Sequence, residues 1–180
     1  MRKGLFILSE LSQEDLEWML TIATSEELEA GTTIIEEGKP IHSVYIVLQG
    51  TLVVEVAALE GKEIAKIGIG EVLGEMSFLD TRPPSATVKV LEDAIVLSIP
   101  RLALEQKLER DTAFAARFYR AIAVFLSNRL RLTVSHLGYE EQAPSDRRSA
   151  NSSPRNQPGK SVDRLIERLE AHRETISRSL

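Results

Sequence analysis

Cysteine is absent from the 180-residue chain, and aromatic residues make up only 5% of it. Without cysteine there is no disulfide framework, no thiolate metal site and no cysteine nucleophile. No run of about 18 apolar residues occurs, so no membrane-spanning helix is expected. The apolar stretch 5–8 ends at Ser9 and is too short for a secretion signal. These absences favour a cytoplasmic protein.

An excess of positive charge is also missing. The chain has 22 Lys and Arg against 27 Asp and Glu, a formal net charge of -5, which argues against a generally basic nucleic-acid binder. Hydrophobic residues reach 43%, enough to bury a core. The three histidines, His42, His136 and His172, are far apart, and no serine lies in a nucleophile elbow. We therefore expect neither a metal site nor an enzyme.

Short β-rich runs separated by glycine or turn residues occupy the stretch 25–99. Runs rich in β-branched residues lie at 32–35, 43–48, 51–56, 63–67, 86–90 and 94–99. Gly50 predicts a tight hairpin between two of them, and Glu60-Gly61 predicts the next. Several short strands at this spacing indicate a mainly β domain, a sandwich or a barrel.

Helical patterns flank this stretch. Ser12 predicts the N-cap of a short amphipathic helix, and Pro100 and Asp111 precede two further helices. The last helix, 112–137, has a long apolar stripe. Its members are Phe114, Phe118, Ile122, Phe125, Leu126, Leu130, Val134 and Leu137. This face must be buried, against the β domain or against a second subunit.

The C-terminal part of the chain has a different composition. Residues 138–160 are rich in Ser, Pro, Asn and Arg with almost nothing apolar, so burial cannot offset their ordering entropy and a disordered linker is expected. Residues 161–180 have a weak apolar stripe and predict a short amphipathic helix or tail. The folded domain is therefore expected at 1–137, with the long helix included.

One motif is more specific than these patterns. Residues 73–88 read LGEMSFLDTRPPSATV, which resembles the phosphate-binding cassette of the cyclic nucleotide-binding domain family. The segments 29–38, EAGTTIIEEG, and 45–50, YIVLQG, are similar to that family's barrel strands. The resemblance spans roughly 5–137. It implies a jelly-roll-like β-barrel with flanking α-helices and a ligand such as cyclic AMP or cyclic GMP, with no other cofactor.

The resemblance also implies which residues bind the ligand. They are Gly74, Glu75, Met76, Ser77, Ser85, Ala86 and Thr87, and Arg82 is added as a candidate because it lies in the same turn. Unpaired backbone amides of Met76 and Ser77 at a helix start suit a phosphate anion. The carboxylate of Glu75 can accept a hydrogen bond from a ribose hydroxyl. Alternatively, Glu75 only stabilises the start of that helix.

Pro84 departs from the family pattern, because it lies where the family has its phosphate-clamping arginine. Proline offers neither charge nor an N–H donor there. Losing a charged hydrogen bond costs about 1.5 to 3 kcal/mol, roughly one to two orders of magnitude in affinity. Arg82 either swings into the vacated space or is a solvated turn residue. The pocket then binds nucleotide weakly, binds another anion, or binds nothing.

Two functions follow from these observations. The first is a non-catalytic cyclic nucleotide-binding regulatory module that signals through a partner protein. The alternative is a degenerate scaffold or adaptor that no longer binds nucleotide. Transcription factors of this family have a helix-turn-helix after the long helix, and the residues after 137 leave no room for that DNA-binding domain. A homodimer through the helix 112–137 is a separate expectation.

Overall fold

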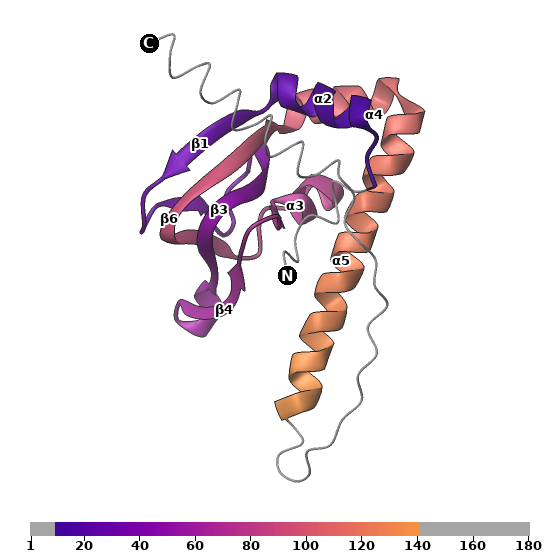
Figure 1. Ribbon diagram of the computed structural model, residues 1–180. Coiled ribbons are helices and arrows are strands. Elements are labelled where there is room, and N and C mark those ends of the chain that lie inside the picture. Colours follow the sequence, from indigo (N-terminus) through magenta and orange to yellow (C-terminus); the bar gives the residue numbers. More distant parts are fainter. Residues whose placement is uncertain (1–9, 141–180) are drawn as a thin grey trace.

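The computed structural model describes residues 10–140 (Figure 1). Its elements are α2 (Gln13–Ile22), β1 (Thr24–Leu28), β2 (Thr33–Ile35), β3 (Ser43–Val56), the 3-10 turn η1 (Ala57–Leu59), β4 (Lys62–Ile67), β5 (Val72–Leu73), α3 (Glu75–Asp80), β6 (Thr87–Pro100), α4 (Arg101–Arg110) and α5 (Thr112–Glu140). Helix α5 continues three residues past the expected end at 137. The rest of the predicted linker 138–160 and the segment 161–180 lie outside the described residues.

The six strands form one antiparallel sheet in the order β1-β6-β3-β4, with β2 added to β6 and β5 added to β3. β3 and β6 are the long central strands, and they pair from Ser43↔Pro100 to Glu55↔Thr87. Helices α2, α4 and α5 lie along the same side of the sheet (Figure 1). The expected mainly β domain with flanking helices is confirmed.

The hairpin predicted at Gly50 is wrong, because β3 runs through this residue without turning back. Gly50 has φ 88°, and the pairing with β6 shifts register on both sides of it. A Cβ atom here would lie 2.5 Å from the carbonyl oxygen of Asp93. Glycine is therefore required for the close approach of two central strands, not for a turn.

Other strand predictions were partly right. The predicted runs 86–90 and 94–99 form one continuous strand, β6, and the sequence patterns missed β1 and β5. The Glu60-Gly61 hairpin is confirmed. Glu60 and Gly61 have φ 56° and 75°, and they return the chain from η1 into β4.

The predicted helix starts are confirmed by their caps. Ser12 and Asp15 form a reciprocal capping box at the start of α2, with bonds of 3.2 and 2.8 Å. Pro100 is the extended N-cap of α4. Asp111 caps α5, because its carboxylate accepts a hydrogen bond from the Phe114 amide at 2.9 Å.

Two hydrophobic clusters hold the fold together. One lies within the curved sheet and contains Val47 and Leu52 of β3. The other lies between the sheet and the helices and includes Phe114, Phe118 and Leu104. Both faces of the central strands are therefore covered, which explains why β3 and β6 are apolar along much of their length.

The apolar stripe of α5 is buried only along its first half. Phe114, Phe118, Ile122 and Phe125 lie in the core. Leu130 and Val134 are 64% and 59% exposed, where the helix projects past the strands (Figure 1). The β domain thus buries the first half of the stripe, and burial against a second subunit remains a prediction for the second half. Among residues 10–140, no helix is long and apolar enough to cross a membrane.

Candidate ligand site

The cassette begins where β5 turns into α3. Gly74 is the N-cap of α3 with φ 81°, and its carbonyl accepts a hydrogen bond from the Phe78 amide at 3.0 Å. A Cβ atom on Gly74 would lie 2.7 Å from Ile41 Cδ1 and 3.2 Å from the carbonyl oxygen of Ser43. Both the backbone conformation and the space thus require glycine at this turn. The turn fixes Glu75 as the first residue of α3.

Glu75 is buried and already has a partner. Its side chain is only 3% exposed, and its Oε1 accepts a hydrogen bond from Nη1 of Arg129 at 2.8 Å. Burial raises the pKa of the Glu75 carboxyl above its ordinary value of 4.5, although the positive charge of Arg129 acts in the opposite direction. Glu75 is thus a buried carboxyl group whose charged form is favoured both by Arg129 and by a backbone hydrogen bond.

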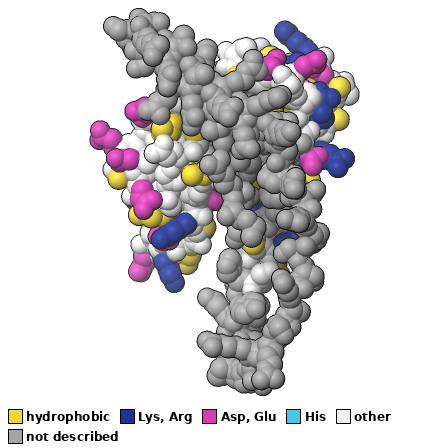
Figure 2. All heavy atoms as spheres, viewed as in Figure 1, with side chains coloured by type: hydrophobic (Ala, Val, Ile, Leu, Met, Phe, Trp, Pro, Cys, Tyr) yellow, Lys and Arg dark blue, Asp and Glu magenta, His cyan; other side chains and the backbone are white. Residues whose placement is uncertain are grey.

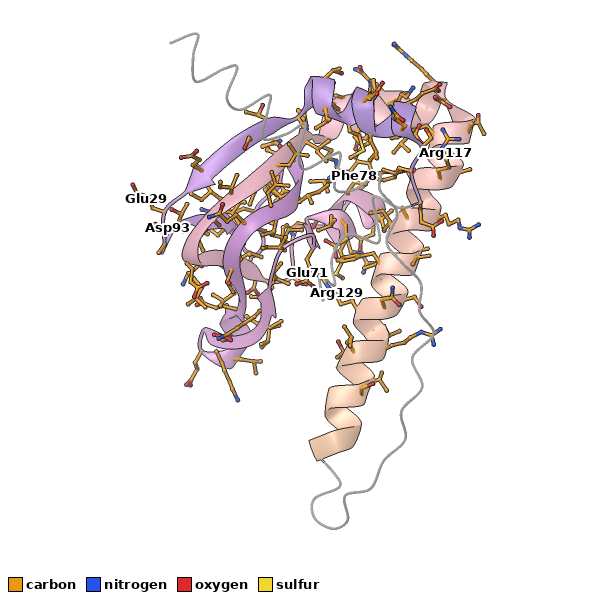
Figure 3. All side chains as sticks on the ribbon, viewed as in Figure 1. Glu29, Glu71, Phe78, Asp93, Arg117 and Arg129 are labelled. Carbon is orange, nitrogen blue, oxygen red and sulfur yellow. The ribbon has the colours of Figure 1, made fainter. Side chains whose placement is uncertain are left out.

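Arg129 comes from α5, far away in the sequence. Its Nη2 also donates to the carbonyl of Val72 at 3.3 Å, and its guanidinium lies 4.6 Å from the ring centre of Phe125. Figure 3 shows the side chain extending from α5 toward the sheet domain, near Glu71. The apolar stripe of 112–137 did not point to this residue, because the stripe contains no arginine. The signal was present, since Arg129 lies four residues after the buried Phe125.

The rest of α3 is attached to α4. The Ser77 carbonyl accepts a hydrogen bond from Nη1 of Arg101 at 3.1 Å, and the Arg101 guanidinium lies 5.7 Å from the ring centre of Phe78. The side chain of Ser77 is buried, whereas that of Met76 is exposed. Met76 and Ser77 are the two residues whose backbone amides are expected to face the ligand. Of their side chains, only that of Met76 lies in solvent.

Arg82 lies in solvent. Its side chain is 83% exposed, and its Nε is 4.0 Å from Asp80 Oδ2, an exposed and weak ion pair. Its backbone amide donates to Asp80 Oδ1 at 3.0 Å, as in an ordinary Asx-stabilised turn. This position matches the interpretation of Arg82 as a solvated turn residue.

The second half of the cassette is tied to a different neighbour. The Pro84 carbonyl accepts from the Gly38 amide at 2.9 Å, and the Thr87 hydroxyl accepts from the Glu37 amide at 3.1 Å. Ser85 is exposed and Ala86 is half-buried. Within residues 10–140, the Glu75 side chain thus contacts α5, while Pro84 and Thr87 form hydrogen bonds with the turn around Gly38.

Charge alone does not mark this site. At the cassette, charges of both signs occur, since Glu75 pairs with Arg129 and Arg82 lies 4.0 Å from Asp80. Elsewhere, Figure 2 shows acidic and basic side chains interspersed on the visible described surface of one face. No group of three or more metal-ligating side chains occurs among residues 10–140. An anionic ligand would therefore depend on local hydrogen-bond donors.

Comparison with known proteins agrees with this geometry. The family profile described as cyclic nucleotide-binding domain matches residues 25–111. A cyclic nucleotide-binding domain from Methylobacillus flagellatus matches with a TM-score of 0.69 at 21% identity, over 78% of this chain and 83% of that chain. The regulatory domain of Toxoplasma gondii PKA, crystallised with cAMP, matches with a TM-score of 0.52 at 26% identity, over 56% of this chain and 39% of that chain.

A curated relative extends the comparison. An uncharacterized NTE family protein of Mycobacterium tuberculosis is 28% identical over 120 residues, which is 67% of this chain and 20% of the relative. The chain thus spans about a fifth of that relative's length. The mainly β fold and the matched segment are those of a class of domain that is typically regulatory and not catalytic. Through residues 25–111 the chain belongs to the cyclic nucleotide-binding domain family.

Proposed function

We propose that the protein is a non-catalytic sensor that binds a cyclic nucleotide and signals through a partner protein. The observation that carries this proposal is the cassette 73–88, with Gly74 in the left-handed conformation and Glu75 at the first position of α3. The family match and the cAMP complex of the Toxoplasma relative support cyclic AMP or cyclic GMP as the ligand.

Different cassette residues would contact different parts of the nucleotide. The amides of Met76 and Ser77 and the small residues Ser85 and Ala86 would face the cyclic phosphate. Glu75 would accept the hydrogen bond of a ribose hydroxyl. Because Pro84 removes a charged donor, we expect binding about one to two orders of magnitude weaker than with arginine at that position.

Titration calorimetry with cyclic AMP and cyclic GMP tests this function. We expect saturable binding of at least one nucleotide, weakened about tenfold or more in Glu75→Gln protein, because the amide no longer offers a charged acceptor. Glu36→Gln is the matched control, since Glu36 is an exposed acid outside the cassette. Absence of heat at high-micromolar ligand in the wild type, in Pro84→Arg and in Arg129→Ala protein would overturn the proposal.

The alternative is a scaffold or adaptor that has lost its ligand. Two features favour it: Pro84 in the phosphate turn, and the engagement of Glu75 by Arg129. Such a protein would bind partners through its helices or through residues 138–180. Pull-down with full-length protein and with a form ending at 137 separates these surfaces, because equal partner recovery would contradict an adaptor that depends on the tail.

We also infer that α5 pairs with a second copy of the chain. Its exposed side has apolar or small residues at the a and d spacing of a coiled coil. They are Ala116, Tyr119, Ala123, Leu126, Leu130 and Thr133, and the sequence continues the pattern at Leu137. Leu130 is exposed, and Leu126 is only half-buried. This face lies beside the one that packs into the core, and Leu126 belongs to both.

Flanking charges are compatible with that pairing. In a parallel pair, Arg120 and Arg129 would lie at e and g positions respectively. Their cross-chain neighbours would be Ala115 and Val134, which carry no charge. We call the a and d residues of this pairing face the seam. No like charges would therefore oppose each other along the seam.

A further inference from the structure

We propose that Arg129 acts as an internal occupant of the ligand site, so that a nucleotide must displace it from Glu75 and thereby release the C-terminal half of α5. This inference rests on the proposed function, because it concerns the same site. It adds a regulatory contact that the cassette motif does not contain.

The contact is asymmetric in burial. Glu75 is 3% exposed, whereas Arg129 is 32% exposed. Glu75 is held at the buried junction between β5 and α3, and Arg129 reaches it from outside with bonds of 2.8 Å to Glu75 and 3.3 Å to the Val72 carbonyl. A ligand hydroxyl that approaches the carboxylate therefore meets the arginine first. The arginine is the partner that can move.

Two halves of α5 are attached very differently. The first half is fixed by buried Phe114 and Phe118 and by the ion pair of Arg117 with Asp15. Beyond Arg129, the side-chain hydrogen bonds of the described part of α5 stay inside the helix, as from Thr133 Oγ1 to the Arg129 carbonyl at 3.0 Å. Arg129 is thus the last polar contact between the described part of α5 and the sheet domain.

Hydrophobic packing does not replace this contact. Leu130, Leu132 and Val134 are all more than half exposed. Leu126 is the last residue of α5 that packs against the core. Breaking the Arg129–Glu75 pair would leave residues 127–135 without side-chain attachment to the strands, and a ligand that takes Glu75 would free them. These residues include Leu130 of the proposed seam, so displacement of Arg129 would alter how two copies meet.

Hydrogen–deuterium exchange of residues 127–135 tests the attachment without any ligand. We expect exchange about tenfold faster in Arg129→Ala and in Glu75→Gln protein than in the wild type, because each removes one side of the pair. Arg131→Ala is the matched control, since Arg131 is exposed on the same helix two residues away. Arg129→Gln provides a second variant if the alanine form is poorly folded. Equal exchange in all these proteins would overturn the proposal.

Titration with cyclic AMP and cyclic GMP tests the competition. Arg129→Ala protein should bind at least about tenfold more tightly than the wild type, and Arg131→Ala should bind like the wild type. Weaker or unchanged binding in Arg129→Ala would overturn the proposal, because Arg129 would then assist the ligand or be irrelevant to it. Absence of binding in every variant would instead refute the proposed function, while the exchange result still decides whether Arg129 holds α5.

Discussion

Asp15 and Arg117 join the first described helix to the last one. Although 102 positions separate them, the Asp15 carboxylate accepts hydrogen bonds from Arg117 Nε at 2.6 Å and from Nη2 at 2.8 Å. Asp15 also completes the capping box with Ser12. One buried carboxylate thus fixes both the start of α2 and its position against α5.

This pair makes stability depend on acid pH. The Arg117 hydrogen bond lowers the pKa of Asp15 from 3.8 to about 2. A depressed pKa stabilises the folded state above pH 3.8, and the contribution is lost as the pH falls toward 2. We expect Asp15→Asn to lower the free energy of unfolding by about 2 kcal/mol at pH 7 and by much less at pH 2.

Urea denaturation between pH 2 and pH 7 measures this difference. Glu14→Gln is the control, because Glu14 is an exposed acid in the same helical turn. A difference between wild type and Asp15→Asn that stays constant over the whole pH range would show that the charge of Asp15 is not its source.

Restoring an arginine at position 84 should strengthen nucleotide binding. We expect Pro84→Arg to raise the affinity for cyclic AMP or cyclic GMP about 10- to 100-fold, by adding a charged donor to the phosphate. The Gly38 bond uses the backbone carbonyl of Pro84, so the substitution preserves it. Calorimetry with Pro83→Arg as the neighbouring control measures the effect. Equal affinities of the two variants would show that the phosphate does not bind beside position 84.

Substitution of Leu130 tests whether two copies of α5 pair through the seam. Leu130→Glu should convert a dimer into a species near the chain mass of 20.0 kDa, because a charge at a core position opposes coiled-coil packing. Leu132→Glu is a matched control, since Leu132 is similarly exposed but lies on the other side of the helix. Light scattering gives the masses. A wild-type protein that is monomeric at all concentrations contradicts the seam.

Gly50 tests the close approach of the central strands. Gly50→Ala combines a positive φ with a Cβ only 2.5 Å from Asp93 O, so we expect a loss of about 3 kcal/mol or more in unfolding free energy. Gly31→Ala shares the positive φ of 89° but meets nothing within 4 Å, and it should lose only about 1 kcal/mol. Chemical denaturation compares the two. Equal losses would mean that the strand contact is unimportant.

Features with local causes could be predicted from the sequence. The caps at Ser12 and Asp111 and the hairpin at Glu60-Gly61 depend on residues within three or four positions. Gly50 could not be assigned this way, because a glycine in a hairpin and a glycine in a bulge have the same local chemistry. What decides between them is Asp93, 43 residues later in the sequence and adjacent in the sheet.

In the candidate site, too, local features could be predicted from the sequence and contacts between distant residues could not. The spacing of the motif predicted the cassette from Gly74 to Thr87, and the family profile that matches residues 25–111 confirms the expected resemblance. The pairing of Glu75 with Arg129 spans 54 positions and involves a polar residue beside an apolar stripe. Counting only apolar periodicity on α5 therefore could not reveal which arginine turns toward the sheet.

The uneven attachment of α5 has a mechanical consequence. From Phe125 to Glu140 the helix extends for fifteen residues, roughly 22 Å at 1.5 Å per residue. A rotation of about 10° about the buried phenylalanines would carry the far end about 4 Å. In the proposed sensor the helix would act as a lever arm, in which a small change of tilt beside the cassette produces a larger displacement at the far end of α5.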